Sequence, residues 1–217
     1  MALAIVQGLL RILETDASVT RSWTSTPTQG NLLIAIGRGT TVITNASISG
    51  WTLAKSILSG TTTSIGIWYK IAGASEGDVT LDWVSSTATY LQILEVSGLA
   101  SAVLDKTAGT ANTGGVTSKS TGTTATTTAN EEFCIAAVSM GDVVSSLSWS
   151  NSFNNLDTLQ TLHFVSYLFQ SAAAAQETTA SWTTSRIAGA CIATFKAGAA
   201  AGIAIPVLLN QFRMRRE

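Results

Sequence analysis

Few residues in this sequence could do acid–base or metal chemistry, and none of them are spaced as in a catalytic or metal-binding motif. His163 is the only histidine among the 217 residues, and it lies in the apolar run Leu162-His163-Phe164-Val165. A strand histidine beside aromatic and aliphatic neighbours is typical of packing, and neither a serine elbow nor a cysteine partner accompanies it. The sequence also lacks a glycine-rich phosphate loop. We therefore expect no catalytic, metal-binding or cofactor-binding residue.

Pairs of carboxylates could cleave a glycosidic bond if two of them lay about 5 to 10 Å apart. Asp78 and Asp82 share a strand face, but four residues at roughly 3.3 Å each place them about 13 Å apart. Glu131 and Glu132 are adjacent and point to opposite faces of a strand. A calcium site using Asp78, Asp82 or Asp142 stays open, although no EF-hand or RTX loop is present. A hydrolase has the least support.

Exposed tryptophans could instead stack on sugar rings, as they do in carbohydrate-binding modules. The sequence has six tryptophans. Trp83 and Trp182 fall in step with the apolar residues of their strands, which predicts core packing. Trp51 and Trp149 occupy matching places before aromatic strands, and we expect them to be partly exposed. They are the candidate ligand-binding residues, and carbohydrate is the candidate ligand.

The two cysteines, Cys134 and Cys191, each lie in the middle of an apolar run. Neighbouring strands could bring them close, so a disulfide is one alternative. Two cysteines form no disulfide framework, however, and buried cysteine behaves as a small hydrophobe. We predict reduced, buried thiols.

The elements that would position these residues follow a pattern that occurs twice, about a hundred residues apart. Each unit contains a Thr-rich lead-in, an apolar run, an aromatic strand, a tryptophan strand and a second apolar run. The first unit uses residues 31–36, 65–69, 79–83 and 91–96, and the second uses residues 133–138, 164–167, 179–182 and 190–195. A duplicated set of strands is typical of a scaffold.

Hydrophobic periodicity gives the fold class. Val79, Leu81 and Trp83 alternate with polar residues, as in a half-solvated antiparallel strand, whereas the apolar runs need cover on both faces. No segment shows a sustained helical period. We predict an all-β fold, an antiparallel β-sandwich that is jelly-roll-like, spanning residues 1–197 with pseudo-repeats at about 20–98 and 120–197.

Residues 107–130 join the two units and consist mainly of Thr, Gly, Ser and Ala. Their alternation suits an extended strand at the surface, because threonine tolerates a sheet edge well. A linker is the alternative interpretation.

Residues 198–217 are predicted to be a partner-docking arm. A free tail of this composition would expose apolar surface, so it should dock on the sandwich or on a neighbouring subunit, with its arginines at the rim. Its apolar part is too short for a membrane span, which takes about twenty residues. The docking residues are Ile203, Ile205, Val207, Leu208, Leu209, Phe212, Arg213, Arg215 and Arg216.

The charge balance excludes one class of partner. The chain has 12 Lys and Arg against 13 Asp and Glu, a formal net charge of −1. Nucleic-acid binding needs a concentrated basic face, which these scattered residues do not supply, so we expect no nucleic-acid partner.

Several short motifs resemble a β-sandwich family encoded in phages and bacterial genomes. They are STPTQGNLLIA at 25–35, GWT at 50–52, WYKIA at 68–72, EVSG at 95–98 and ATFK at 193–196. The resemblance covers residues 20–196 and carries no functional residue over. It implies a virion structural protein such as a capsid decoration (cement) protein, a head fibre or a tail component.

The sequence therefore favours a non-enzymatic protein located in the virion, a capsid decoration or cement protein. Its expected partners are other virion proteins, the major capsid or tail protein, and further copies of itself. The resemblance makes a trimer one candidate oligomer, although no residue fixes the number three. The alternative is a tail or head-fibre adhesion module that binds host carbohydrate through Trp51 and Trp149.

Overall fold

The computed structural model describes residues 2–14, 17–40, 46–61, 63–83, 89–156 and 161–198. Every regular element within these ranges is a β-strand, and every strand pairing is antiparallel. The prediction of an all-β protein is confirmed.

The strands of the first half precede residue 98 and those of the second half follow it. The first half contains β1 (Ala4–Glu14), β2 (Ser18–Arg21), β3 (Leu32–Gly39), β4 (Ala46–Ser47), β5 (Thr52–Ser59), β6 (Thr63–Ile71), β7 (Val79–Trp83) and β8 (Thr89–Ser97). The second half contains β9 (Leu99–Ala111), β10 (Val116–Ser120), β11 (Glu132–Val144), β12 (Leu147–Trp149), β13 (Asn154–Asn155), β14 (Thr161–Gln170), β15 (Thr179–Arg186) and β16 (Ala188–Ala197).

These strands form two five-stranded and two three-stranded sheets. The first five-stranded sheet has the order β1-β8-β3-β6-β5, and the second has the order β13-β14-β11-β16-β9. Adding eight to each number of the first order gives β9-β16-β11-β14-β13, which is the second order read from its other edge. The three-stranded sheets, β2-β7-β4 and β10-β15-β12, are related by the same shift. Both halves of the chain therefore have the same strand connectivity.

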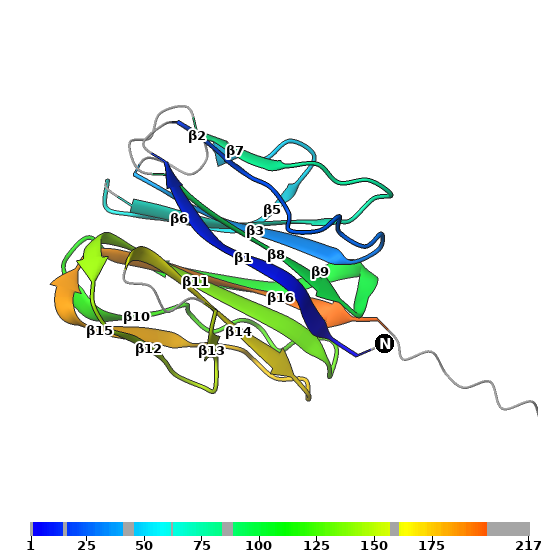
Figure 1. Cartoon of the computed structure of the whole chain (residues 1–217). Coiled ribbons are helices and arrows are strands. Elements are labelled where there is room, and N and C mark those ends of the chain that lie inside the picture. The colour runs from blue at the N-terminus through cyan, green and yellow to red at the C-terminus, as the bar shows by residue number, and fades with distance from the viewer. Residues whose placement is uncertain are drawn as a thin grey trace, which may run out of the picture.

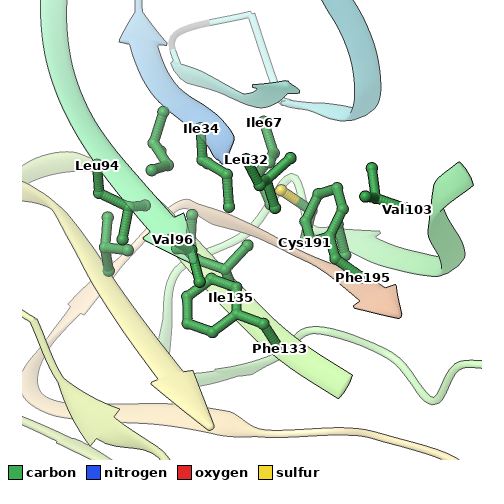
Figure 2. Close-up of a cluster of buried hydrophobic side chains, with 14 of the residues drawn as sticks. Leu32, Ile34, Ile67, Leu94, Val96, Val103, Phe133, Ile135, Cys191 and Phe195 are labelled. Carbon is green, nitrogen blue, oxygen red and sulfur yellow. The ribbon is translucent and has the colours of Figure 1, made fainter. Parts of the chain in front are cut away.

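The two five-stranded sheets lie face to face, and a three-stranded sheet covers the other side of each (Figure 1). The central cluster joins β3, β6 and β8 to β11, β14 and β16, and Figure 2 shows its side chains meeting between the layers. Because the central strands are covered on both sides, their sequences are apolar on both faces. The outer clusters include Trp83 and Trp182, whose predicted core packing is confirmed.

Two glycines bring the edge strand β5 close to the second five-stranded sheet. A Cβ atom on Gly109 of β9 would lie 2.5 Å from the Ile57 side chain, and one on Gly189 of β16 would lie 2.8 Å from it. Contacts below 3.0 Å do not occur between real side chains, so any larger residue would push β5 away. The missing side chains create the slot that Ile57 fills.

Residues 107–130 are held by strand pairing and hydrogen bonds, so the linker interpretation is wrong. They begin in β9, continue through β10 and then run beside residues 174–178. There every third residue is a buried threonine whose N–H donates to that segment and whose hydroxyl accepts an N–H from it. The threonines are Thr121, Thr124 and Thr127, and their partners are Thr178, Gln176 and Ala174.

Candidate functional site

The predicted arm lies almost wholly outside the described residues, which end at Gly198. The predicted docking residues in this part of the chain are Ile203, Ile205, Val207, Leu208, Leu209, Phe212, Arg213, Arg215 and Arg216. The structure does place the point from which the arm departs. Ala197 N–H donates to the Glu131 carbonyl at 2.9 Å, and Gly198 N–H donates to the Gly98 carbonyl at 2.7 Å.

The N-terminal residues lie at the same point. A Cβ atom on Gly98 would be 2.5 Å from the backbone oxygen of Ala2, and Gly98 has a φ of +85°, which favours glycine. Figure 1 shows the N-terminus beside the last described residues of β16. Both ends of the described chain therefore meet at the turn between β8 and β9.

A groove of about 290 Å³ opens beside this point. Its lining comes from the residues before β1, from the residue before β11 and from the end of β14 with the residue after it, so both halves contribute to it. The lining residues are Ala2, Leu3, Glu131, Phe169, Gln170 and Ser171. The Phe169 side chain is 39% exposed, although its ring centroid lies 5.5 Å from those of both Phe133 and Tyr167. The groove thus presents part of an aromatic cluster to solvent.

Two buried carboxyl groups, those of Asp105 and Glu132, lie near the same end of the second five-stranded sheet. Asp105 accepts hydrogen bonds from the Thr128 N–H at 2.6 Å, the Thr128 hydroxyl at 2.8 Å and Lys106 Nζ at 3.1 Å. Burial opposes the ionisation of Asp105, but these bonds and one from Glu132 outweigh it and hold its pKa below the usual range. Asp105 is therefore ionised at neutral pH.

Glu132 behaves in the opposite way. Burial raises its pKa to about 7, and the negative charge of Asp105 contributes to the increase. One ionised and one protonated carboxyl group is the pairing that glycosidases use. Here, however, the Asp105 side chain is 4% exposed and Glu132 is 0% exposed, so a sugar has no access to either. The pair can act as a pH-sensitive structural contact.

Trp51 and Trp149 do not form a joint platform. Trp51 packs, partly buried, against the cluster beneath the sheet β2-β7-β4. Trp149 packs, partly buried, against the clusters on the outer face of the second five-stranded sheet. The two five-stranded sheets lie between them. A shallow pocket of about 330 Å³ at the start of β12 is lined by hydroxyl side chains, Leu147 and Trp182, and Trp149 is not among its lining residues.

His163 lies inside the protein, between the two five-stranded sheets. Its ring meets that of Tyr90 edge to face, with the centroids 5.6 Å apart, and the guanidinium carbon of Arg38 lies 5.6 Å from the Tyr90 centroid. Burial lowers the pKa of Arg38 to about 10, against the opposing effect of Tyr90. His163 therefore belongs to a buried packing cluster, as its sequence context predicts.

The acidic residues considered as calcium ligands have separate surroundings. Asp82 accepts a hydrogen bond from Ser18 at 2.8 Å, and Asp142 pairs with Arg186 at 3.0 Å. Within the described ranges, no three His, Cys, Asp or Glu side chains form a group that could hold a metal ion.

Both cysteines are free and buried. They lie on the neighbouring strands β11 and β16, but Cys191 faces the central cluster whereas Cys134 faces the outer one. Since the sheet separates the two thiols, the disulfide alternative is wrong.

Three charged residues are buried although the sequence reasoning did not predict their burial: Arg38, Glu95 and Glu132. Glu95 accepts hydrogen bonds from Gln7 at 2.6 Å and from the Thr28 N–H at 2.9 Å, and thereby fixes the loop before β3. Each of the three interrupts or borders an apolar run in the sequence. A lone charge in such a run is the signal that could have identified them.

The part of the chain that the structure describes contains no helix with the length and hydropathy to cross a membrane. In the comparisons with known proteins, no family model, no curated protein and no solved structure matches the chain.

Proposed function

We propose that this chain is a non-enzymatic structural protein of a virus particle, a capsid decoration or cement protein that binds the particle surface and neighbouring copies of itself. The observation that carries the proposal is the groove beside Gly198, because it leaves Phe169 39% exposed at the point where an apolar and basic segment departs. Exposed apolar patches rimmed by polar groups are typical of interaction surfaces. Binding would use apolar area and backbone pairing, without a chemical step.

The proposal includes a finer description of the fold. Each half would be a jelly-roll-like β-sandwich, and both halves would derive from one repeated strand unit. The support is that a shift of eight converts the strand orders of the first half into those of the second. In each half the first strand also pairs with the eighth, as in an eight-stranded double sheet built from Greek keys.

Particle binding tests the proposal. The full chain and a chain that ends at Gly198 are each sedimented with virus particles from the source organism. The full chain should bind saturably, and the shorter chain should bind at least about tenfold more weakly, because it lacks the docking residues. Equal binding by both chains would show that the arm does not contribute to particle binding.

The same samples address the adhesion alternative. If neither chain binds particles, while glycans shift the tryptophan fluorescence of the wild type but not of Trp51→Ala or Trp149→Ala, the carbohydrate-binding function replaces the structural one.

A further inference from the structure

The groove beside Gly198 is large enough for side chains that the described residues do not supply. A cavity of 150 Å³ accommodates a benzene molecule, so the groove of about 290 Å³ has room for roughly two branched aliphatic side chains. Filling it would also cover the exposed part of Phe169.

The backbone beside the groove is open for pairing. β13 contributes only two residues, which pair with Tyr167 and Ser166 of β14. Beyond Tyr167, β14 pairs with β11 on one side and has no strand on the other within the described ranges. An extended segment can add to such an edge through main-chain hydrogen bonds and place alternate side chains in a groove.

The C-terminal sequence has the pattern that this edge requires. Ile203, Ile205 and Val207 alternate and would share one face of an extended strand. Pro206 falls between them, and proline is tolerated on an edge strand. The arginines that follow have the opposite charge to Glu131, which is exposed in the groove lining.

The spacing favours the groove of another copy. Gly198 already lies at the rim of its own groove, through the contacts of Gly98 and Glu131. Four small residues, at 199–202, separate it from Ile203, and an extended chain of that length spans about 13 Å. If these four residues are extended, Ile203 would lie beyond the rim of its own groove and within reach of a neighbouring copy.

We propose that residues 203–209 of one copy dock in the groove of a second copy, so that neighbouring copies exchange C-terminal arms. The inference rests on the proposed docking role of the arm and requires no location in a virion. Exchange of an identical segment between copies forms a homo-oligomer at a low cost in free energy.

Mixed cross-linking tests the exchange. One copy carries Ser171→Cys and a second, isotopically labelled copy carries Val207→Cys, while the native thiols are buried. Mild oxidation should give a labelled–unlabelled disulfide dimer at least about tenfold faster than a control pair in which Thr113→Cys replaces Ser171→Cys. Thr113 is exposed beyond the far end of β9.

Two results would overturn the proposal. One is cross-linking of the mixed pair at the rate of the control. The other is a chain with both substitutions that closes within itself, at high dilution, faster than the mixed pair cross-links, because the arm would then occupy its own groove.

A charge placed in the groove gives a second test. Phe169→Asp should weaken self-association in analytical ultracentrifugation by at least about tenfold, because docking would bury the carboxylate. Val143→Asp is the control, since Val143 is 48% exposed and lies on β11 away from the groove. Unchanged association of Phe169→Asp contradicts the exchange. If cross-linking occurs but particle binding does not, only the virion role is lost.

Discussion

Nη2 of Arg38 donates a hydrogen bond to the backbone oxygen of Met140 across 3.0 Å, and so joins β3 of one five-stranded sheet to β11 of the other. Nearby, the hydroxyls of Thr63 and Ser139 lie 2.8 Å apart across the same interface. Buried polar groups must find partners within the protein. These contacts therefore fix how the two halves pack, in addition to the apolar cluster between them.

Arg38→Ala should lower the free energy of unfolding by about 2 to 4 kcal/mol, because it leaves the Met140 oxygen without this donor and opens a cavity. Urea denaturation measures the change. Arg186→Ala is the matched control, since its ion pair with Asp142 is partly solvent-exposed and should contribute at most about 1 kcal/mol. Equal effects of the two substitutions would contradict the role given to Arg38.

Glu132 should make stability depend on pH. Its pKa is about 7 in the folded protein against an ordinary 4.5, so the folded state binds more protons in that interval and stability falls as pH rises through it. The loss should amount to about 2 to 3 kcal/mol. Asp105 gives stability the opposite pH dependence. Its ionised form stabilises the folded state, and this stabilisation is lost as pH falls below its ordinary pKa of 3.8. The two effects together predict greatest stability near pH 4 to 5.

Glu132→Gln isolates the effect, because the amide can still donate to Asp105 but does not titrate. In this variant the midpoint temperature of thermal unfolding should change much less with pH between pH 4.5 and 7 than in the wild type. Glu131→Gln, at the exposed neighbouring position, should keep the wild-type pH dependence. If Glu132→Gln keeps the wild-type pH dependence, the ionisation of Glu132 is not its cause.

The buried threonines Thr121, Thr124 and Thr127 should stabilise the fold through the hydrogen bonds of their individual hydroxyl groups. The buried Thr124 hydroxyl accepts the Gln176 N–H at 2.9 Å, so Thr124→Val should cost about 1 to 2 kcal/mol and speed hydrogen exchange at Gln176. Thr126 is exposed on the same segment, and Thr126→Val should change stability by no more than about 0.5 kcal/mol. Equal costs would mean that β-propensity, not the hydroxyl contact, sets the effect.

The native thiols should resist modification. Burial raises the pKa of Cys191 to about 12 and moves that of Cys134 well above its usual range, and the thiolate is the reactive form. A thiol-specific chromogenic reagent should react only as the protein unfolds, with two equivalents per chain. Rapid reaction of one equivalent in the folded state would show that one of the thiols is accessible.

The sequence predicts individual strands well where burial is uniform. The runs that became β3, β11 and β16 are apolar on both faces because sheets cover them on both sides. The alternation in β7 is equally clear, since Val79, Leu81 and Trp83 are buried while Asp82 is exposed.

Features set by strand register could not be predicted in the same way. Cys134 and Cys191 point to opposite faces because Cys191 pairs with Ala137, three residues from Cys134, and an odd offset changes the face. The unpaired edge of β14 beyond Tyr167 likewise depends on β13 having only two residues, which no hydrophobic pattern encodes. Nor does periodicity show that Trp51 and Trp149 lie on opposite outer layers.

The central claim is that this chain is a structural component of a virus particle. Quantitative mass spectrometry of gradient-purified particles from the source organism tests it most directly. The account predicts a fixed copy number of the same order as that of the major capsid protein. A few copies per particle would instead indicate a tail or fibre component, and absence of the chain from the particles would contradict the claim.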